Sequence, residues 1–175
     1  AYPILTHPYK FGNHHGWVGI SHCAVFNDGK GNWYYASQQR FPENYKGNAN
    51  SNALMLGGVR SIIWTSDGWP LVLPERYAGI TQKAITETEL LGDWQHINLA
   101  YHYKKQDASV VMTLGNDHKV KSGWKAGKAW TFDASKNVLT IDNEQFYLRR
   151  ELDWEANPRK ETIVYVGLSK DGKTT

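Results

Sequence analysis

The stretch "WVGISHCAVFNDGKGNWYYASQQRF" (residues 17–41) contains two apolar runs separated by a turn signal. Residues 17–26 and 32–41 have the composition of strands, and the intervening "NDGKG" supplies the turn, so we predict an antiparallel hairpin. Residues 59–65 and 69–74 flank "SDG" and predict a second hairpin. Together they predict a four-stranded antiparallel meander of about the size of one propeller blade.

An isolated four-stranded meander has two exposed edges and two uncovered faces. Such a sheet buries too little apolar surface to be stable by itself in water. We therefore expect these strands to have neighbours on both sides, supplied by a longer protein.

From Gly92 onward the sequence breaks into seven short apolar segments separated by turns rich in Gly, Asn, Asp and Lys. Apolar residues alternate over residues 97–101 and 110–114, which is the period of half-buried strands. Seven short strands at this spacing predict a sandwich or a small antiparallel barrel with an open edge. Thr86 and Glu89 have capping-box spacing and predict a short helical turn before these strands. The predicted fold class is all-β.

Composition excludes few functions. The 175-residue chain carries 20 Lys and Arg against 17 Asp and Glu, a formal net charge of +3, with the two signs interspersed. The bases form short doublets instead of the face or stripe typical of nucleic-acid binders, so we expect no nucleic-acid partner. The sequence contains no run of eighteen apolar residues, so we expect no membrane partner. The single cysteine, Cys23, excludes an intrachain disulfide.

Two parts of the sequence carry a family resemblance. Residues 64–79, "WTSDGWPLVLPERYAG", with "GWVGISHCAVF" and "YYASQQRF" upstream, resemble the end of the propeller in two-domain arabinan-degrading enzymes of glycoside hydrolase family 43. The segments "GDWQHINLAYHY" and "LRRELDWEANPRKETIVYVGL" resemble the C-terminal domain of the same enzymes. In that family a five-bladed β-propeller carries catalysis and a C-terminal β-barrel domain follows it.

The resemblance implies that residues 1–77 are the last, incomplete blade of a propeller catalytic domain and that residues 78–175 are a C-terminal β-barrel accessory domain. It implies an arabinan endo-1,5-α-L-arabinosidase type of glycosidase, with inverting hydrolysis by an acid and a base roughly 6.5–9.5 Å apart. In the family these carboxylates come from earlier blades, so we expect no catalytic residue in this chain and no hydrolysis by the chain alone. The expected partners are arabinan or arabino-oligosaccharide and the remaining blades, and the expected location is secreted or periplasmic.

His22 is the candidate metal ligand. The resemblance implies that a histidine at this place on the last blade binds a divalent cation, calcium in the two-domain enzymes, with waters completing the shell. Calcium prefers oxygen ligands, so one imidazole makes a weak site without a shaped pocket. From the residues alone, a buried histidine bonded to the backbone is the alternative.

The other titratable residues of the first half have simpler interpretations. Four carboxylates fall there, and no two of them form a pair on inner strands: Asp28, Glu43, Asp67 and Glu75. Asp28 and Asp67 occupy turn signals, where Asp side chains cap backbone amides. Adjacent residues on an extended segment point apart. His14 and His15 therefore predict a solvated or substrate-facing loop in preference to a two-histidine metal site, and Cys23, next to His22, should face the core.

The eight tryptophans are compatible with sugar stacking, but core packing explains most of them. A non-catalytic carbohydrate-binding β-barrel module is the alternative function, and an exposed aromatic row on one barrel face would favour it. A lipocalin-like carrier is a third interpretation, suggested by "GDW" (residues 92–94), and it requires a closed, apolar-lined cavity. The sequence identifies no substrate-binding residue.

Overall fold

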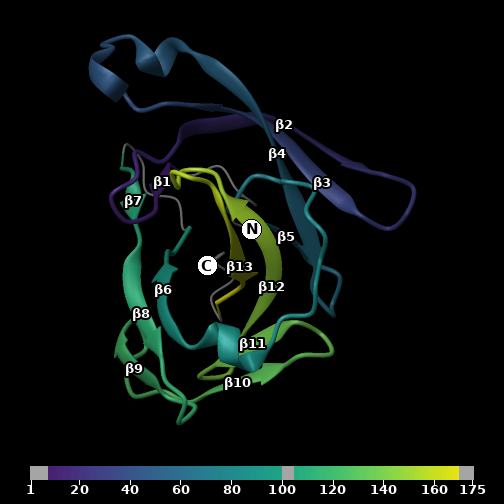
Figure 1. The fold of residues 1–175 in the computed structure, drawn as a ribbon. Coiled ribbons are helices and arrows are strands. Elements are labelled where there is room, and N and C mark those ends of the chain that lie inside the picture. Colours follow the sequence, from purple (N-terminus) through teal and green to yellow (C-terminus); the bar gives the residue numbers. More distant parts are fainter. Residues whose placement is uncertain (1–7, 100–104, 170–175) are drawn as a thin grey trace.

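The computed structural model describes residues 8–99 and 105–169, and within these ranges the chain is all-β with only short 3₁₀ turns as helices. Figure 1 shows an extended sheet that contains β2, β3 and β4 and a curved set of strands that runs from β6 to β13. No helix in the described ranges is long and apolar enough to cross a membrane.

The predicted meander is present. Four strands pair antiparallel in the order in which they occur in the sequence: β2 (Val18–Asn27), β3 (Trp33–Arg40), β4 (Met55–Trp64) and β5 (Pro70–Val72). The connection between β3 and β4 carries two 3₁₀ turns, η1 (Tyr45–Gly47) and η2 (Ser51–Ala53). The number of blades in a complete propeller stays a prediction.

The seven segments predicted for the second half all contain strands: β6 (Gly92–His96), β8 (Val110–Leu114), β9 (Val120–Gly123), β10 (Trp130–Asp133), β11 (Val138–Ile141), β12 (Glu144–Asp153) and β13 (Lys160–Gly167). β6, β8 and β9 form one antiparallel sheet, and β10 to β13 form another. A bridge between Lys119 and Ala129 joins the two sheets. They form a half-barrel whose edge strands, β6 and β13, do not pair with each other within the described ranges.

The first of these segments is shorter than its alternation predicts. β6 ends at His96, and Ile97 and Leu99 are buried without forming a strand. Residues 100–104 of the same segment lie outside the described residues. The alternation of buried Ile97 and Leu99 therefore does not correspond to strand pairing.

A short parallel pair connects the beginning of the chain to its second half. β1 (Tyr9–Lys10) pairs with β7 (Asp107–Ala108), and Tyr9 also forms an antiparallel bridge with Trp17. The Gln106 side-chain amide donates to the carbonyl oxygens of Tyr9 and His15 at 3.2 and 2.8 Å. This pair crosses the predicted boundary between residues 77 and 78, and the division into two domains stays a prediction.

The predicted helical turn is η3 (Glu87–Leu90), and its capping box is present. The backbone N–H of Thr86 donates to the Glu89 carboxylate at 2.9 Å. The cap satisfies an amide that the turn itself leaves unpaired. It orients the turn so that Leu90 is fully buried.

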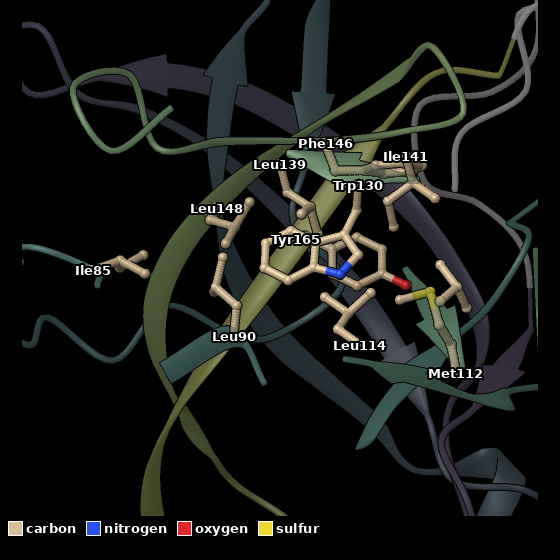
Figure 2. Packing of buried hydrophobic residues seen from close by; sticks show 11 residues of the cluster. Ile85, Leu90, Met112, Leu114, Trp130, Leu139, Ile141, Phe146, Leu148 and Tyr165 are labelled. Atoms are coloured by element: carbon tan, nitrogen blue, oxygen red, sulfur yellow. The ribbon is translucent and has the colours of Figure 1, made fainter. Parts of the chain in front are cut away.

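Buried side chains form three clusters. The largest fills the half-barrel, and Figure 2 shows Trp130 among residues of η3, β8, β11, β12 and β13. Its members are Ile85, Leu90, Met112, Leu114, Val120, Trp130, Leu139, Ile141, Phe146, Leu148 and Tyr165. The second cluster joins the first sheet to the N-terminal segment and residues 97–99, and consists of Tyr9, Trp17, Ile20, Tyr35, Ile62, Val72, Ile97 and Leu99. The third packs β5 on β13 through Leu71, Leu73 and Val166.

A buried carboxylate also joins the two halves. Glu151 on β12 is 1% exposed. It accepts hydrogen bonds from the Ser61 hydroxyl of β4 at 3.4 Å and from the backbone N–H of Ala78 at 2.9 Å. Arg149 lies 3.3 Å from the same carboxylate and balances its charge. The third cluster and Glu151 therefore attach the first sheet directly to the β12–β13 hairpin.

Candidate functional site

His22 lies near the middle of β2, the edge strand of the first sheet. The pairing of β2 with β3 is interrupted between Val18 and Ser21 and again between Ser21 and Ala24. His22 sits in the second interruption with φ of +47°, and its side chain is exposed. A left-handed residue in a bulge redirects its side chain out of the regular alternation of the strand. Among the described residues His22 is therefore not a buried histidine.

The His, Cys, Asp and Glu side chains of the described residues do not gather into a metal site at His22. Among the described residues His22 belongs to no group of three metal-ligating side chains, so it offers one nitrogen donor. Calcium takes roughly six to eight oxygen ligands. A calcium ion at this place would therefore need oxygen ligands other than these side chains, such as water and carbonyl groups.

Cys23 does not face the core. It is exposed, because the bulge that contains His22 shifts the register and breaks the two-residue alternation on which the prediction relied. Burial raises the pKa of the neighbouring Tyr35 hydroxyl, and a hydrogen bond with Cys23 adds to the shift.

The two adjacent histidines point to different surroundings. His14 is exposed, whereas His15 is half-buried and its ring packs against Trp17, Phe41 and Tyr45 with centroid distances of 5.6, 5.2 and 4.2 Å. Burial lowers the pKa of His15, which favours its neutral form. His15 therefore belongs to an aromatic cluster instead of a solvated loop, whereas His14 lies on the surface.

The carboxylates in the turns of the first sheet have structural roles. Asp28 accepts the backbone N–H groups two and four residues further on at 2.8 and 3.1 Å, as predicted. Asp67 does not cap an amide as predicted. It accepts the Thr65 hydroxyl, and the Thr65 oxygen accepts the Trp69 N–H at 2.8 Å. Glu43 is exposed in the loop after β3.

Glu75 lies in an acidic cluster that the sequence analysis missed. Carboxylate oxygens of Glu75, Asp153 and Glu155 lie within 4.8 Å of one another, and all three residues are partly buried. Glu75 follows β5, whereas Asp153 ends β12 and Glu155 lies in the turn before β13. The members come from two segments far apart in the chain, so no spacing motif in the sequence signals the cluster.

Electrostatics in the acidic cluster favour a bound proton. Burial, and after it the charge of Glu155, raises the pKa of Glu75 to about 8, because both disfavour a second negative charge. The oxygens are closer together than the roughly 6.5–9.5 Å that separates the acid and base of an inverting glycosidase. The cluster is therefore not such a catalytic pair.

Arg76 lies beside this cluster and between two indole rings. Its guanidinium carbon is 5.1 Å from the ring centroid of Trp17 and 4.9 Å from that of Trp154. The same side chain pairs with Glu155 at 3.3 Å, and the Trp154 indole N–H donates to the Arg76 carbonyl at 3.1 Å. The guanidinium carbon of Arg159 lies 4.6 Å from the ring centroid of Trp154. Three separate segments of the chain meet at this arginine.

A cavity of about 920 Å³ opens at the same junction. Its lining includes residues 9–14 and 16–17, residues of β6 and β13, and the whole acidic cluster. The lining mixes apolar and charged side chains. The closed, apolar cavity that a carrier requires is not seen in the described part of the chain.

Core packing accounts for several tryptophans. Trp17 and Trp130 are buried, and Trp94 and Trp124 pack against the largest cluster. Trp64 and Trp69, by contrast, are 42% and 43% exposed on either side of the β4–β5 turn. Within the described second half, no aromatic side chain is among the exposed large hydrophobic residues. The aromatic row that would favour a binding module on the barrel surface is therefore absent from those residues.

Comparison with known proteins adds a family match. Residues 74–175 match the GH43_C family model, described as a C-terminal lipocalin-like domain. The chain is 26% identical to extracellular endo-alpha-(1->5)-L-arabinanase 2 of Bacillus subtilis (strain 168), in an alignment that covers 90% of this chain and 32% of the relative.

Solved structures show the same fold. The crystal structure of the glycoside hydrolase family 43 protein YxiA from Bacillus licheniformis matches with a TM-score of 0.76 and 22% identity, covering 95% of this chain and 36% of that one. Endo-1,5-alpha-L-arabinanase from Thermotoga petrophila RKU-1 matches with a TM-score of 0.70 and 21% identity, covering 91% of this chain and 35% of that one. The chain spans about a third of the length of these relatives.

Proposed function

Since the chain belongs, through residues 74–175, to the GH43_C family of C-terminal lipocalin-like domains, we propose that it is the C-terminal part of a glycoside hydrolase that acts on α-1,5-linked arabinan. The family match is the observation that carries this proposal. Two of the relatives reported above are named arabinanases, which supports arabinan as the substrate. Inverting hydrolysis would use carboxylates on propeller blades outside this chain.

The surface of the first sheet supports a role in completing a propeller. Residues 22–27 of β2 are exposed, and Val25 and Phe26 are 49% and 45% accessible on opposite faces of this edge strand. An apolar edge strand of this kind is a site for pairing or packing. We propose that neighbouring blades, from the same protein or a second chain, cover it.

His22 would then contribute one ligand to a calcium ion. Its exposure on the edge strand of the sheet leaves the imidazole accessible to water and to groups from neighbouring blades. A polymeric substrate and an extracellular relative support secretion of the complete enzyme.

Native mass spectrometry and an arabinan assay test this function together. The chain alone should appear at 19.9 kDa and release no reducing sugar from linear arabinan. With a polypeptide that supplies the other blades, it should form a complex of larger mass that hydrolyses arabinan. Hydrolysis by the chain alone, or a complex of the two parts that leaves arabinan intact, contradicts the proposal.

The role of His22 is tested in the same complex. His22→Ala should raise the calcium concentration needed for half-maximal activity, whereas His118→Ala, which changes an exposed histidine in the turn between β8 and β9, should leave it unchanged. Equal calcium dependence in the two variants would exclude His22 as a ligand.

A further inference from the structure

The junction cavity has the size of a ligand site. Its volume of about 920 Å³ falls within the roughly 300–1,000 Å³ of small-molecule sites. One side is formed by the N-terminal segment around Phe11, and another by β6 with Asp93, Trp94 and Gln95. The acidic cluster and β13 complete the lining.

The charge of the lining disfavours anions. The lining contains six acidic side chains and three basic ones, Lys10, Arg150 and Lys160. Arg150 is already paired with two glutamates at 2.9 and 3.2 Å. Asp93 and Asp153 each have one carboxylate oxygen that accepts no hydrogen bond from the described residues. These oxygens repel a phosphate or an acidic sugar but accept hydrogen bonds from hydroxyl groups.

The apolar part of the lining suits a sugar ring. Phe11 and Trp94 are partly buried aromatic side chains in the wall, and the indole N–H of Trp94 already donates to the Leu90 carbonyl at 2.7 Å. Trp94 therefore offers its ring atoms and no free polar group. Gln95, the next residue of β6, also lines the cavity, and its amide oxygen accepts the Ser109 hydroxyl at 2.6 Å. An aromatic surface next to unpaired acceptors matches the apolar faces and outward hydroxyls of a neutral sugar.

We infer that the junction cavity binds a neutral oligosaccharide. The identification of that sugar as arabino-oligosaccharide rests on the proposed function, whereas the place of the site rests on the cavity itself. A site for a divalent ion alone would need neither the aromatic wall nor a cavity of this size. The cavity would hold a stretch of the polysaccharide while other parts of the enzyme cleave it.

The test is an NMR titration of the 175-residue chain with arabinotriose and arabinopentaose. We expect shifts at the Trp94 indole and the Gln95 side chain. The double variant Asp93→Asn/Asp153→Asn keeps the shape of both side chains but replaces acceptor oxygens with amide groups, and should bind about tenfold more weakly. The matched control is Asp133→Asn, which changes a carboxylate at the end of β10, outside the cavity lining. It should bind as the unmodified chain does.

Four outcomes overturn this inference: no shift at millimolar sugar, shifts confined to the exposed Trp64 and Trp69, equal affinity in the double variant and the control, or binding of calcium without binding of sugar. The assay needs no catalysis and no other blade. Its failure therefore leaves hydrolysis by an assembled enzyme untouched, and failure of hydrolysis leaves binding to the cavity measurable.

Discussion

At the scale of single residues, Glu75 takes its acid–base behaviour from groups that only the fold brings near. Its carboxylate lies within 4.8 Å of those of Asp153 and Glu155, in a partly buried position. The backbone N–H of Arg76 donates to it at 2.8 Å and opposes the rise in its pKa, but burial and like charge outweigh this contact. The result is a carboxyl group that keeps its proton near neutral pH.

The stability of the chain should therefore depend on this carboxyl. The folded pKa of Glu75 is about 8 and its unfolded value 4.5, so the folded state keeps a proton that the unfolded state releases. The free energy of unfolding should fall as pH rises from 4.5 to about 8 and level off above it. Glu75→Gln should match the unmodified chain near pH 4 and exceed it at pH 9. The full shift corresponds to about 5 kcal/mol, and we expect on the order of 2–3 kcal/mol because solvent reaches the partly buried carboxyl group. Urea unfolding across this range measures the difference.

Glu43→Gln is the control, because Glu43 is exposed in a loop. It should leave the pH dependence of unfolding as it is. A Glu75→Gln profile parallel to that of the unmodified chain would show that Glu75 does not carry the proton.

The exposure of the His22 and Cys23 side chains could not be predicted from the sequence. The sequence predicted that both residues lie on the first strand, but it did not predict that both side chains are exposed. A bulge removes the alternation on which that prediction depends. The acidic cluster was inaccessible for a different reason. Its members meet only through the packing of β5 against β12 and β13, and no local pattern encodes that contact.

At the scale of elements, the strands that could be predicted are those with periodicity or a turn signal. β2 and β3 follow from the turn between them, and β8 follows from its alternation. β1 and β7 could not be predicted, because two residues show no period. Their pairing instead depends on a tight backbone contact in which Gly16 takes part with φ of +64°.

Gly16→Ala should disrupt that contact. A Cβ at this position would lie 2.1 Å from the carbonyl oxygen of Tyr9, so the Tyr9–Trp17 bridge must open. We expect a loss of about 3 kcal/mol or more in the free energy of unfolding. Gly29→Ala is the matched control, because its φ is +71° and no atom lies within 4 Å of the added carbon. It should cost only about 1–2 kcal/mol. Chemical denaturation measures both losses. If the two variants lose the same free energy of unfolding, the added methyl group at position 16 causes no steric clash with Tyr9.

At the scale of the whole molecule, the junction between the two halves is both apolar and charged. The third cluster packs β5 on β13, Glu151 connects β4 to β12, and Arg76 lies between the indoles of Trp17 and Trp154. The sequence predicted two halves with separate strands. It contained no sign of how they attach, because each contact joins residues that are distant along the chain.

Arg76→Ala should weaken this junction. The variant loses contacts with two indole rings and the pair with Glu155, so we expect a loss of about 2–3 kcal/mol in thermal or urea unfolding. Arg159→Ala, an exposed arginine over the same Trp154 ring, should cost less than about 1 kcal/mol. Similar losses for the two variants would mean that Arg76 acts only as a surface cation.

The parallel pair of β1 and β7 has a consequence for a chain that is cut. Residues 81–84, near the start of the second half, have exposed side chains, and a protease that cuts there has to release the Lys83 and Ala84 carbonyls from Arg150. Cleavage there would leave Tyr9 bound to Asp107 and packed with Ile97 and Leu99, so the fragments would be held together without a covalent link. The nicked protein would keep its hydrodynamic radius and sediment as one particle until denaturant separated the pieces. Sedimentation would therefore detect a single species, although the sequence predicts two separate domains.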